Sequence, residues 1–322
     1  MQPEGLTAAP APAGHVLAGA IPDFFIVGAP KCGTTSLYRY LEANPEIFLC
    51  SEKEPGFFCA DLPFRNVTTI GRYCGLFADR GDRLIAGEAS PWYLYSRVAV
   101  PEILRLRNDA RFIVMLRNPV ELAVSLFFQH RHDGIEPEAS FASAWEVQRD
   151  THLADFGSID HAIPGFPYLD ICRLGSQLER LLTLVRADRV LVVFLEDLAA
   201  DPGSVVRQVS DFLGVAPRQP TSFQVHNSSR KNRSDALAQA WRAATKRGWL
   251  YWAVKRSVNA VGLRPGRWLF ERLITRETSY DRPPPALIRS MQQQLDPDIA
   301  LLERLTGRRL DRWRAASAAP SS

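Results

Sequence analysis

The sequence has few cysteines and histidines, and neither type forms a metal-binding or disulfide pattern. Of its 322 residues, only five are cysteine and six are histidine. No two cysteines are spaced as Cys-x-x-Cys, and no His-Glu-x-x-His motif occurs. The odd number of cysteines disfavours a disulfide scaffold and fits reduced thiols in a cytosol. We therefore expect neither a zinc site nor another metal centre.

Long apolar runs and targeting signals are missing as well. No run of about 18 apolar residues occurs, so the sequence predicts no membrane-spanning helix. Residues 1–20 contain no Lys or Arg, which is unlike a secretory signal or a transit peptide. We interpret residues 1–20 as a flexible tail and residues 315–322 as a frayed end, and we expect a cytoplasmic protein.

Charge is distributed unevenly along the chain. The formal net charge is +4, but residues 241–276 hold nine Lys or Arg and one acidic residue, so this segment alone carries +8. Four of the seven tryptophans lie in the same segment. We predict a basic, mostly helical segment over 235–280. Three roles are open for it: packing on the sheet, covering an acceptor site, and peripheral contact with the inner face of a membrane. No recognition motif accompanies the charge, so nucleic-acid binding is disfavoured.

The order of apolar and glycine-rich segments predicts an α/β fold. Hydrophobic residues make up 46% and charged residues 23% of the chain, as in ordinary globular proteins. Strands separated by helices favour a central parallel sheet that is covered on both faces. We expect a single three-layer α/β/α domain over 21–314. The predicted elements are strands at 23–27, 111–116 and 190–194, and helices at 34–41, 120–130 and 285–306.

The segment from Gly28 to Gly33 has the glycine spacing of a phosphate-binding loop. It lies between a predicted strand and a predicted helix, where backbone N–H groups and the start of the helix can bind an anion. Loops that bind nucleoside triphosphates need a lysine directly after the second glycine, but Thr34 stands there. The lysine lies inside the loop instead, at Lys31. The spacing therefore predicts a phosphate site that differs from that of common kinases.

Several segments, in order along the chain, resemble the sulfotransferases that use 3′-phosphoadenosine 5′-phosphosulfate (PAPS). The resemblance is to the bacterial branch, which is similar to heparan sulfate sulfotransferase domains. It covers residues 21 to 215 and a closing segment, so it is more specific than one motif. The matching segments are GAPKCGTTSLYRYL, SEKEPGFF, GEASPWYLYS, RFIVMLRNPVELAVSLFFQHR, VLVVFLEDLAADPGSVVRQVSDFLGV and LDPDIALLERLTGRRLDRW.

The resemblance implies a donor site that binds PAPS and releases its product PAP, without a metal ion. Lys31 would stabilise the leaving oxygen, and Arg117 and Ser125 would hold the 3′-phosphate. Arg230 and Lys231, in a later loop, would add to donor binding. The phosphate loop would hold the 5′-phosphate through Lys31, Cys32, Gly33, Thr34, Thr35 and Ser36.

The resemblance also implies the acceptor side of the site. Glu54 would be the general base, with Phe57 and Phe58 shielding it from water and raising its pKa. Lys53 would orient Glu54 or meet the sulfuryl oxygens. A histidine base, His130 or His132, is the alternative in another branch, but we interpret these histidines as structural. Glu88 and Trp92 are the further candidates for acceptor binding, and core packing is an equally good explanation for Trp92.

The function implied is sulfuryl transfer to a hydroxyl, less favourably an amine, by in-line displacement. The acceptor would be a small molecule or a glycan, most readily a carbohydrate or glycolipid. Two alternatives stay open at this point. The first is a small-molecule kinase with an atypical phosphate loop, in which Asp197 would hold Mg²⁺. The second is a non-enzymatic membrane-surface protein built on an inactive nucleotide fold.

Overall fold

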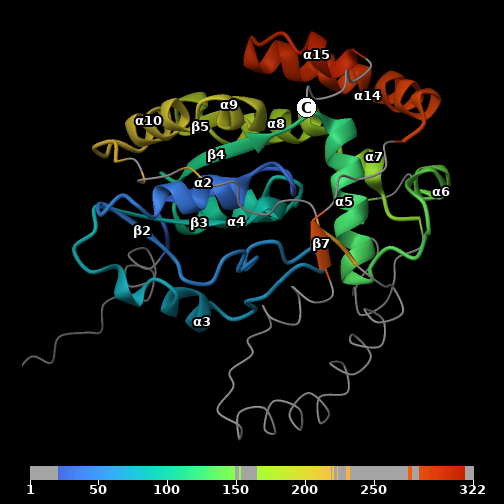
Figure 1. The fold of residues 1–322 in the computed structure, drawn as a ribbon. Coiled ribbons are helices and arrows are strands. Elements are labelled where there is room, and N and C mark those ends of the chain that lie inside the picture. The colour runs from blue at the N-terminus through green and yellow to red at the C-terminus, as the bar shows by residue number, and fades with distance from the viewer. Residues whose placement is uncertain are drawn as a thin grey trace, which may run out of the picture. The chain divides into compact units, whose positions relative to one another are not determined.

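The structure is a computed structural model, and its backbone is shown in Figure 1. The two predicted tails, apart from Ala315, and nearly all of the basic segment lie outside the described residues, so those predictions stay predictions. The described residues are 21–148, 152–153, 165–218, 220, 223, 230–232, 275–277 and 283–315.

Contacts within the chain divide it into two compact units, each built from separate stretches of sequence. The single domain predicted over 21–314 covers parts of both units and stays a prediction. The first unit comprises Met1–Arg117, Leu174–Gln224 and Asp298–Arg309, and the second comprises Asn118–Arg173, Val225–Pro297 and Leu310–Ser322.

The first unit contains a five-stranded parallel sheet with the order β2-β3-β1-β4-β5. The three predicted strands are confirmed as β1, β4 and β5, whereas β2 and β3 were not predicted. All five side chains from Phe112 to Leu116 are completely buried, which is why this run is apolar throughout and does not alternate. The strands are β1 (Phe24–Val27), β2 (Ile47–Leu49), β3 (Ile85–Ala89), β4 (Arg111–Leu116) and β5 (Val190–Phe194).

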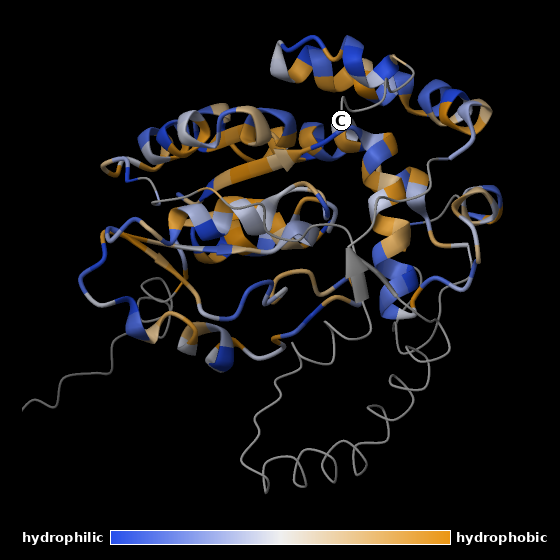
Figure 2. Cartoon of the chain, viewed as in Figure 1, coloured by the Kyte–Doolittle hydropathy of each residue, from blue (hydrophilic) through white to orange (hydrophobic). Residues whose placement is uncertain are grey.

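Helices cover both faces of this sheet and confirm the predicted three-layer α/β/α fold (Figure 1). Helix α2 contacts β1, β3 and α10, whereas α4 contacts α8. Apolar residues gather on the strands and on one side of the helices (Figure 2). The helices and 3-10 turns of this unit are α2 (Thr34–Leu41), α3 (Ile70–Gly75), η1 (Ala78–Arg80), η2 (Pro91–Tyr93), α4 (Ala99–Leu106), α8 (Leu174–Leu184), η4 (Ala187–Arg189), α9 (Leu195–Ala200) and α10 (Pro202–Leu213).

The second unit is mainly helical, with one antiparallel strand pair in its described part. The predicted helix at 285–306 is confirmed as α14, which continues from this unit into the first. Within the segment predicted to be mostly helical over 235–280, Thr275–Glu277 form the short strand β7, which pairs with β6. The elements are α5 (Pro119–Asp133), α6 (Phe141–Val147), α7 (Tyr168–Ile171), β6 (Arg230–Asn232), β7 (Thr275–Glu277), α14 (Pro285–Thr306) and α15 (Asp311–Arg314).

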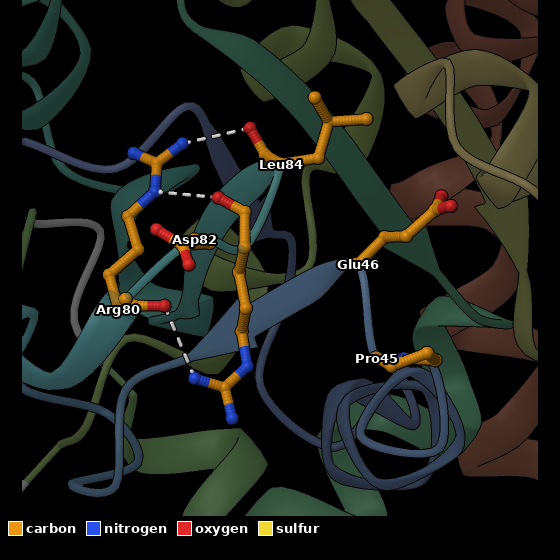
Figure 3. A pocket seen from close by; sticks show the side chains of 7 residues that line it. Pro45, Glu46, Arg80, Asp82 and Leu84 are labelled. Carbon is orange, nitrogen blue, oxygen red and sulfur yellow. Dashed lines mark hydrogen bonds between the residues drawn. The ribbon is translucent and has the colours of Figure 1, made fainter.

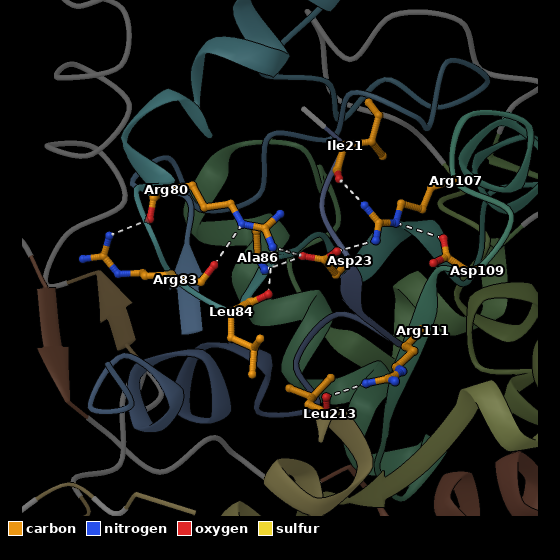
Figure 4. A network of polar contacts seen from close by, with 10 residues as sticks. All are labelled: Ile21, Asp23, Arg80, Arg83, Leu84, Ala86, Arg107, Asp109, Arg111 and Leu213. Carbon is orange, nitrogen blue, oxygen red and sulfur yellow. Dashed lines mark hydrogen bonds and ion pairs between the residues drawn. The ribbon is translucent and has the colours of Figure 1, made fainter. Parts of the chain in front are cut away.

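A buried polar network fixes the amino-terminal end of β1 (Figure 4). The carboxylate of Asp23 accepts hydrogen bonds from the backbone N–H of Ala86 at 2.6 Å and from Arg80 at 2.9 Å, and it pairs with Arg107 on its other oxygen. Its side chain is 14% exposed. Arg107 also pairs with Asp109, whose side chain is 63% exposed.

Replacing Asp23 by Ala should lower the free energy of unfolding by about 2 kcal/mol, because it leaves a buried N–H and two guanidinium groups without their acceptor. Asp109→Ala is the matched control, and it should cost less than about 0.5 kcal/mol because that pair is exposed. Urea unfolding of both variants measures the difference. Equal losses would contradict a structural role for the Asp23 network.

Candidate functional site

The carboxyl-terminal ends of the parallel strands meet at one edge of the sheet, where open α/β folds bind ligands. Each strand that precedes a predicted site residue ends there. The loop with Lys31 follows β1, the segment with Glu54 follows β2, and Arg117 directly follows β4. The fold therefore gathers these three residues of the first unit at the same edge.

Two glycines give the phosphate loop its path. Gly28 has a φ of 123°, and a Cβ there would lie 2.4 Å from the backbone nitrogen of Met115 in β4, so only glycine fits. Gly33 has a φ of 84° and is the N-cap of α2, whose first helical bond runs from Leu37 N–H to the Gly33 carbonyl at 3.1 Å. Because glycine has no side chain that could cap the helix, the first backbone N–H groups of α2 face the loop without a capping side chain.

The side chains of the loop differ in exposure. Cys32, Thr34 and Ser36 are buried, at 0%, 4% and 7% exposure, whereas Lys31 and Thr35 are partly exposed. Burial raises the pKa of the Cys32 thiol far above its ordinary value, and the nearby cations Arg117 and Lys31 only partly oppose this shift. The thiol is therefore neutral at physiological pH, and any contribution of Cys32 to anion binding comes from its backbone N–H.

Arg117 and Lys31, two of the cations predicted for the donor site, come together in the structure. The Nη1 atom of Arg117 donates a hydrogen bond to the Lys31 carbonyl at 3.3 Å. Both charges act on the Cys32 thiol, which places them around the phosphate loop. Positive charge therefore accumulates beside the N-terminus of α2, where an anion is already favoured.

Lys31 and Glu54 share an unusual backbone conformation. Within the described ranges they are the non-glycine residues with positive φ, at 67° and 57° respectively. Such conformations are costly for residues with a Cβ and concentrate at functional sites. The two residues that the sequence singles out as catalytic are thus also the two with this strain.

The carboxylate of Glu54 is exposed rather than shielded. Its side chain is 43% exposed, and its Oε1 accepts a hydrogen bond from the Lys53 ammonium. An orienting role for Lys53 requires this contact, and that role stays a prediction. The predicted shielding by Phe57 and Phe58 is wrong. Both rings instead pack on Tyr73, with centroids 4.7 Å and 5.1 Å from its ring.

Glu88 and Trp92, the two further acceptor-binding candidates, are both buried. Glu88 in β3 is 0% exposed and accepts hydrogen bonds from the hydroxyls of Tyr73 at 2.6 Å, Ser90 at 2.7 Å and Tyr93 at 3.1 Å. Trp92 is 9% exposed and stacks on Phe64 at 4.1 Å. Neither side chain is presented to an acceptor in this structure, so we no longer interpret them as acceptor contacts.

Three other predicted donor residues are not brought to the loop by the described contacts. Ser125 is 5% exposed in α5, which belongs to the second unit. Arg230 and Lys231 lie in β6, and their side chains are outside the described part. Their roles stay predictions. His130, also in α5, is 3% exposed and packs edge-on against Phe166 at 4.3 Å, in agreement with a structural histidine.

A contact that sequence reasoning missed fixes the end of β5. The guanidinium of Arg308 forms a two-pronged ion pair with Asp197, with one of the two N–O distances at 2.8 Å, and lies 4.1 Å from the centre of the Phe194 ring. The partners are 111 positions apart, so no local pattern could reveal them. Asp197, the Mg²⁺ ligand of the kinase alternative, is therefore engaged by an arginine.

A depression lies at the amino-terminal ends of β2 and β3, lined by residues that directly precede these strands (Figure 3). Within it, Arg80 donates to the carbonyl oxygens of Arg83 and Leu84 at 3.3 Å and 2.9 Å. These bonds fix the backbone around the depression, so we interpret the depression as structural. Its lining residues are Pro45, Glu46, Arg80, Gly81, Asp82, Arg83 and Leu84.

Two kinds of feature are absent from the described ranges. No helix there is both long and apolar enough to span a bilayer. No group of three or more His, Cys, Asp or Glu side chains there is placed to hold a metal ion.

Comparison with known proteins gives consistent matches. A 26% identical sulfotransferase from Alicyclobacillus acidocaldarius, known from its crystal structure, superposes with a TM-score of 0.64 over 91% of this chain and 98% of that one. Heparan sulfate glucosamine 3-O-sulfotransferase 3B1 of Mus musculus is 28% identical over 64% of this chain and 50% of its own length. Bifunctional heparan sulfate N-deacetylase/N-sulfotransferase 4 of Mus musculus is 27% identical over 61% of this chain and 23% of its own.

The chain thus spans half or less of the length of these two curated relatives. The match to the family is broader, because the sulfotransferase domain is matched over residues 21–248, which include the phosphate loop, Glu54 and Arg117. The fold, the loop and this match agree, and the chain belongs to the sulfotransferase domain family.

Proposed function

We propose that the protein transfers a sulfuryl group from PAPS to a hydroxyl of a carbohydrate or glycolipid acceptor. The observation that carries this proposal is the convergence of three groups at one edge of the sheet: the loop with Lys31, the Arg117 guanidinium and the Glu54 carboxylate. Membership of the sulfotransferase domain family supports the reaction class.

The phosphate loop fits the donor nucleotide. Gly28 keeps the loop close against β4, Gly33 opens α2 toward an anion, and Lys31 and Arg117 supply two positive charges beside them. PAPS, when bound, supplies an activated sulfuryl group with a nucleotide phosphate as leaving group. Lys31 neutralises the charge that develops on the leaving oxygen, which is the kind of stabilisation that contributes most to such reactions.

Glu54 acts as the general base. Its exposed carboxylate takes the proton from the acceptor hydroxyl as the new oxygen–sulfur bond forms and the bond to the nucleotide phosphate breaks. The Lys53 ammonium holds that carboxylate in place before the reaction. An amine acceptor would use the same groups, and the relatives include both an N-sulfotransferase and a 3-O-sulfotransferase.

We further propose a cytoplasmic location and an acceptor site that includes the basic segment 241–276. None of the five cysteines, all of which lie in the described ranges, forms a disulfide, which suits a reducing compartment. An acidic glycan, or an acceptor in an anionic membrane, would be attracted by the positive charge of that segment. The kinase alternative is disfavoured because Arg308 occupies the carboxylate of Asp197.

The nucleotide preference tests the proposal directly. PAP at roughly a hundred times its dissociation constant should raise the melting temperature by about 5 °C, since binding only the native state stabilises it. ATP with Mg²⁺ should shift it far less, because the loop lacks the lysine after Gly33 that such loops use. Thermal denaturation with each nucleotide measures the shifts. An equal rise in melting temperature with ATP and Mg²⁺ would contradict the proposal.

A further inference from the structure

The buried carboxyl group of Glu88 has an environment that packing alone does not explain. It is completely buried in the middle of the sheet, and its partners in the described residues are three hydroxyl groups and no cation. Burying a carboxylate without a cation costs stability. The buried carboxylate of Glu88 is therefore better explained by a function of the hydroxyl groups that bond to it.

Two of those hydroxyls connect Glu88 to the loop that carries Glu54. The Gly56 N–H donates to Ser90 Oγ at 3.2 Å, and the Phe58 N–H donates to the Tyr93 hydroxyl at 3.3 Å. Each hydroxyl in turn donates to the Glu88 carboxylate. The chain of bonds thus runs from Glu88, through a hydroxyl, to a backbone N–H of the loop.

A third bond joins the same loop to the end of β3, the strand that carries Glu88. The Glu54 N–H donates to the carbonyl of Ala89, the last residue of β3, at 3.1 Å. Glu54 itself has a φ of 57°, which persists only where surrounding contacts hold the backbone. The anchors of residues 54–58 on the segment 88–93 supply that restraint.

We propose that Glu88 is a positioning residue, which fixes the Glu54 base by orienting the Ser90 and Tyr93 hydroxyls that hold the loop 54–58. This inference rests on the proposed function, because it takes Glu54 as the base. A carboxylate can only accept hydrogen bonds, so both hydroxyls point their protons at Glu88 and turn their lone pairs to the loop. An amide in its place would offer protons as well and lose this direction.

The carboxylate form of Glu88, which this arrangement requires, prevails above the pKa of that group and is lost as the pH falls below it. Burial raises the pKa of Glu88 to about 7, and the bonds from Tyr73, Ser90 and Tyr93 oppose the rise. Burial and the Glu88 charge raise the pKa of both tyrosines well above the ordinary value, so both remain donors. Cys50 and Cys59 also face Glu88, and burial raises the pKa of both thiols, which stay neutral.

A matched pair of tyrosine variants separates positioning from stability. Tyr93→Phe removes a hydroxyl that bonds both Glu88 and the Phe58 N–H, whereas Tyr73→Phe removes one that bonds Glu88 and no loop N–H in the described structure. Amide hydrogen exchange, followed by NMR, should become at least tenfold faster at Phe58 in Tyr93→Phe and stay unchanged in Tyr73→Phe. Ser90→Ala should likewise make amide hydrogen exchange at Gly56 at least tenfold faster, and Ser90→Thr should restore the slow exchange there.

Turnover is measured on the same proteins with radiolabelled PAPS and polysaccharide or lipid extracts as acceptor. Tyr93→Phe, Ser90→Ala and Glu88→Gln should lower kcat by about 10²-fold, the effect of a misplaced catalytic group, without changing the melting shift with PAP. Tyr73→Phe should retain wild-type kcat, and Ser90→Thr should recover it.

Equal losses in Tyr93→Phe and Tyr73→Phe, or unchanged exchange at Gly56 and Phe58, would overturn the positioning role while leaving the proposed function intact. A Glu54→Gln variant that turns over normally would overturn the base assignment and the positioning role with it. The exchange measurements need no acceptor, so a failure of the reaction and a failure of the loop anchoring give different results.

Discussion

Replacing Glu54 by Gln should lower kcat by about 10³-fold and leave the melting shift with PAP unchanged. The change removes the carboxylate that accepts the proton, and general-base catalysis typically contributes 10²- to 10⁴-fold. Donor binding should survive because Lys31 and Arg117, which form the donor side, are untouched. The change is nearly isosteric, and the bonds that Glu54 makes through its backbone N–H and carbonyl remain available. Single-turnover transfer from radiolabelled PAPS measures kcat.

Glu52 provides the control for this experiment. It lies two positions away, and its carboxylate accepts two hydrogen bonds from Arg72, at 3.0 Å and 2.9 Å, so it is held away from the reaction. Glu52→Gln removes the same charge from the same segment and should keep kcat within a few-fold of wild type. A similar fall in both variants would show that the local charge, and not proton transfer to Glu54, controls the rate.

The strands that were predicted correctly are those whose sequence carries its own signal. β1, β4 and β5 are apolar runs, buried along nearly their whole length in β1 and β4 and at Val193 and Phe194 in β5, and such runs stand out without knowledge of their partners. β2 has only three residues, and β3 contains Gly87 and Glu88, which weaken the apolar pattern. Gly87 is required because a Cβ there would lie 2.2 Å from the Phe24 ring of the neighbouring strand. That requirement arises from pairing, which no local pattern reveals.

The candidate site also contains features that the sequence can reveal and features that it cannot. Lys31, Arg117 and Glu54 belong to continuous motifs that follow strands, so a resemblance can assign them. The anchoring of the Glu54 loop cannot be predicted in this way, since Gly56 and Ser90 are 34 positions apart and Phe58 and Tyr93 are 35 apart. Glu88 was misinterpreted for the same reason. In a sequence, a charged residue beside aromatic residues is typical of a binding surface. Only the position of Glu88 in the sheet shows that its side chain is buried.

Replacing Lys31 by Asn should lower kcat by about 10²- to 10³-fold, the range found when one charge-stabilising donor is removed from an active site. The choice of Asn follows from the backbone, because Lys31 has a φ of 67° and Asn tolerates this left-handed region better than Ala does. The carbonyl that accepts the bond from Arg117 is kept. The melting shift with PAP should shrink as well, since one of the two cations beside the loop is lost.

Lys31→Gly tests whether the loss comes from the ammonium or from the backbone. Glycine adopts the same φ without strain, so Gly and Asn variants should show the same fall in kcat if the missing charge is the cause. Lys31→Arg keeps a charge and should retain more activity than either. A Gly variant with near wild-type kcat would contradict charge stabilisation by Lys31. It would mean that the strained conformation at this position, rather than its side chain, is what the reaction requires.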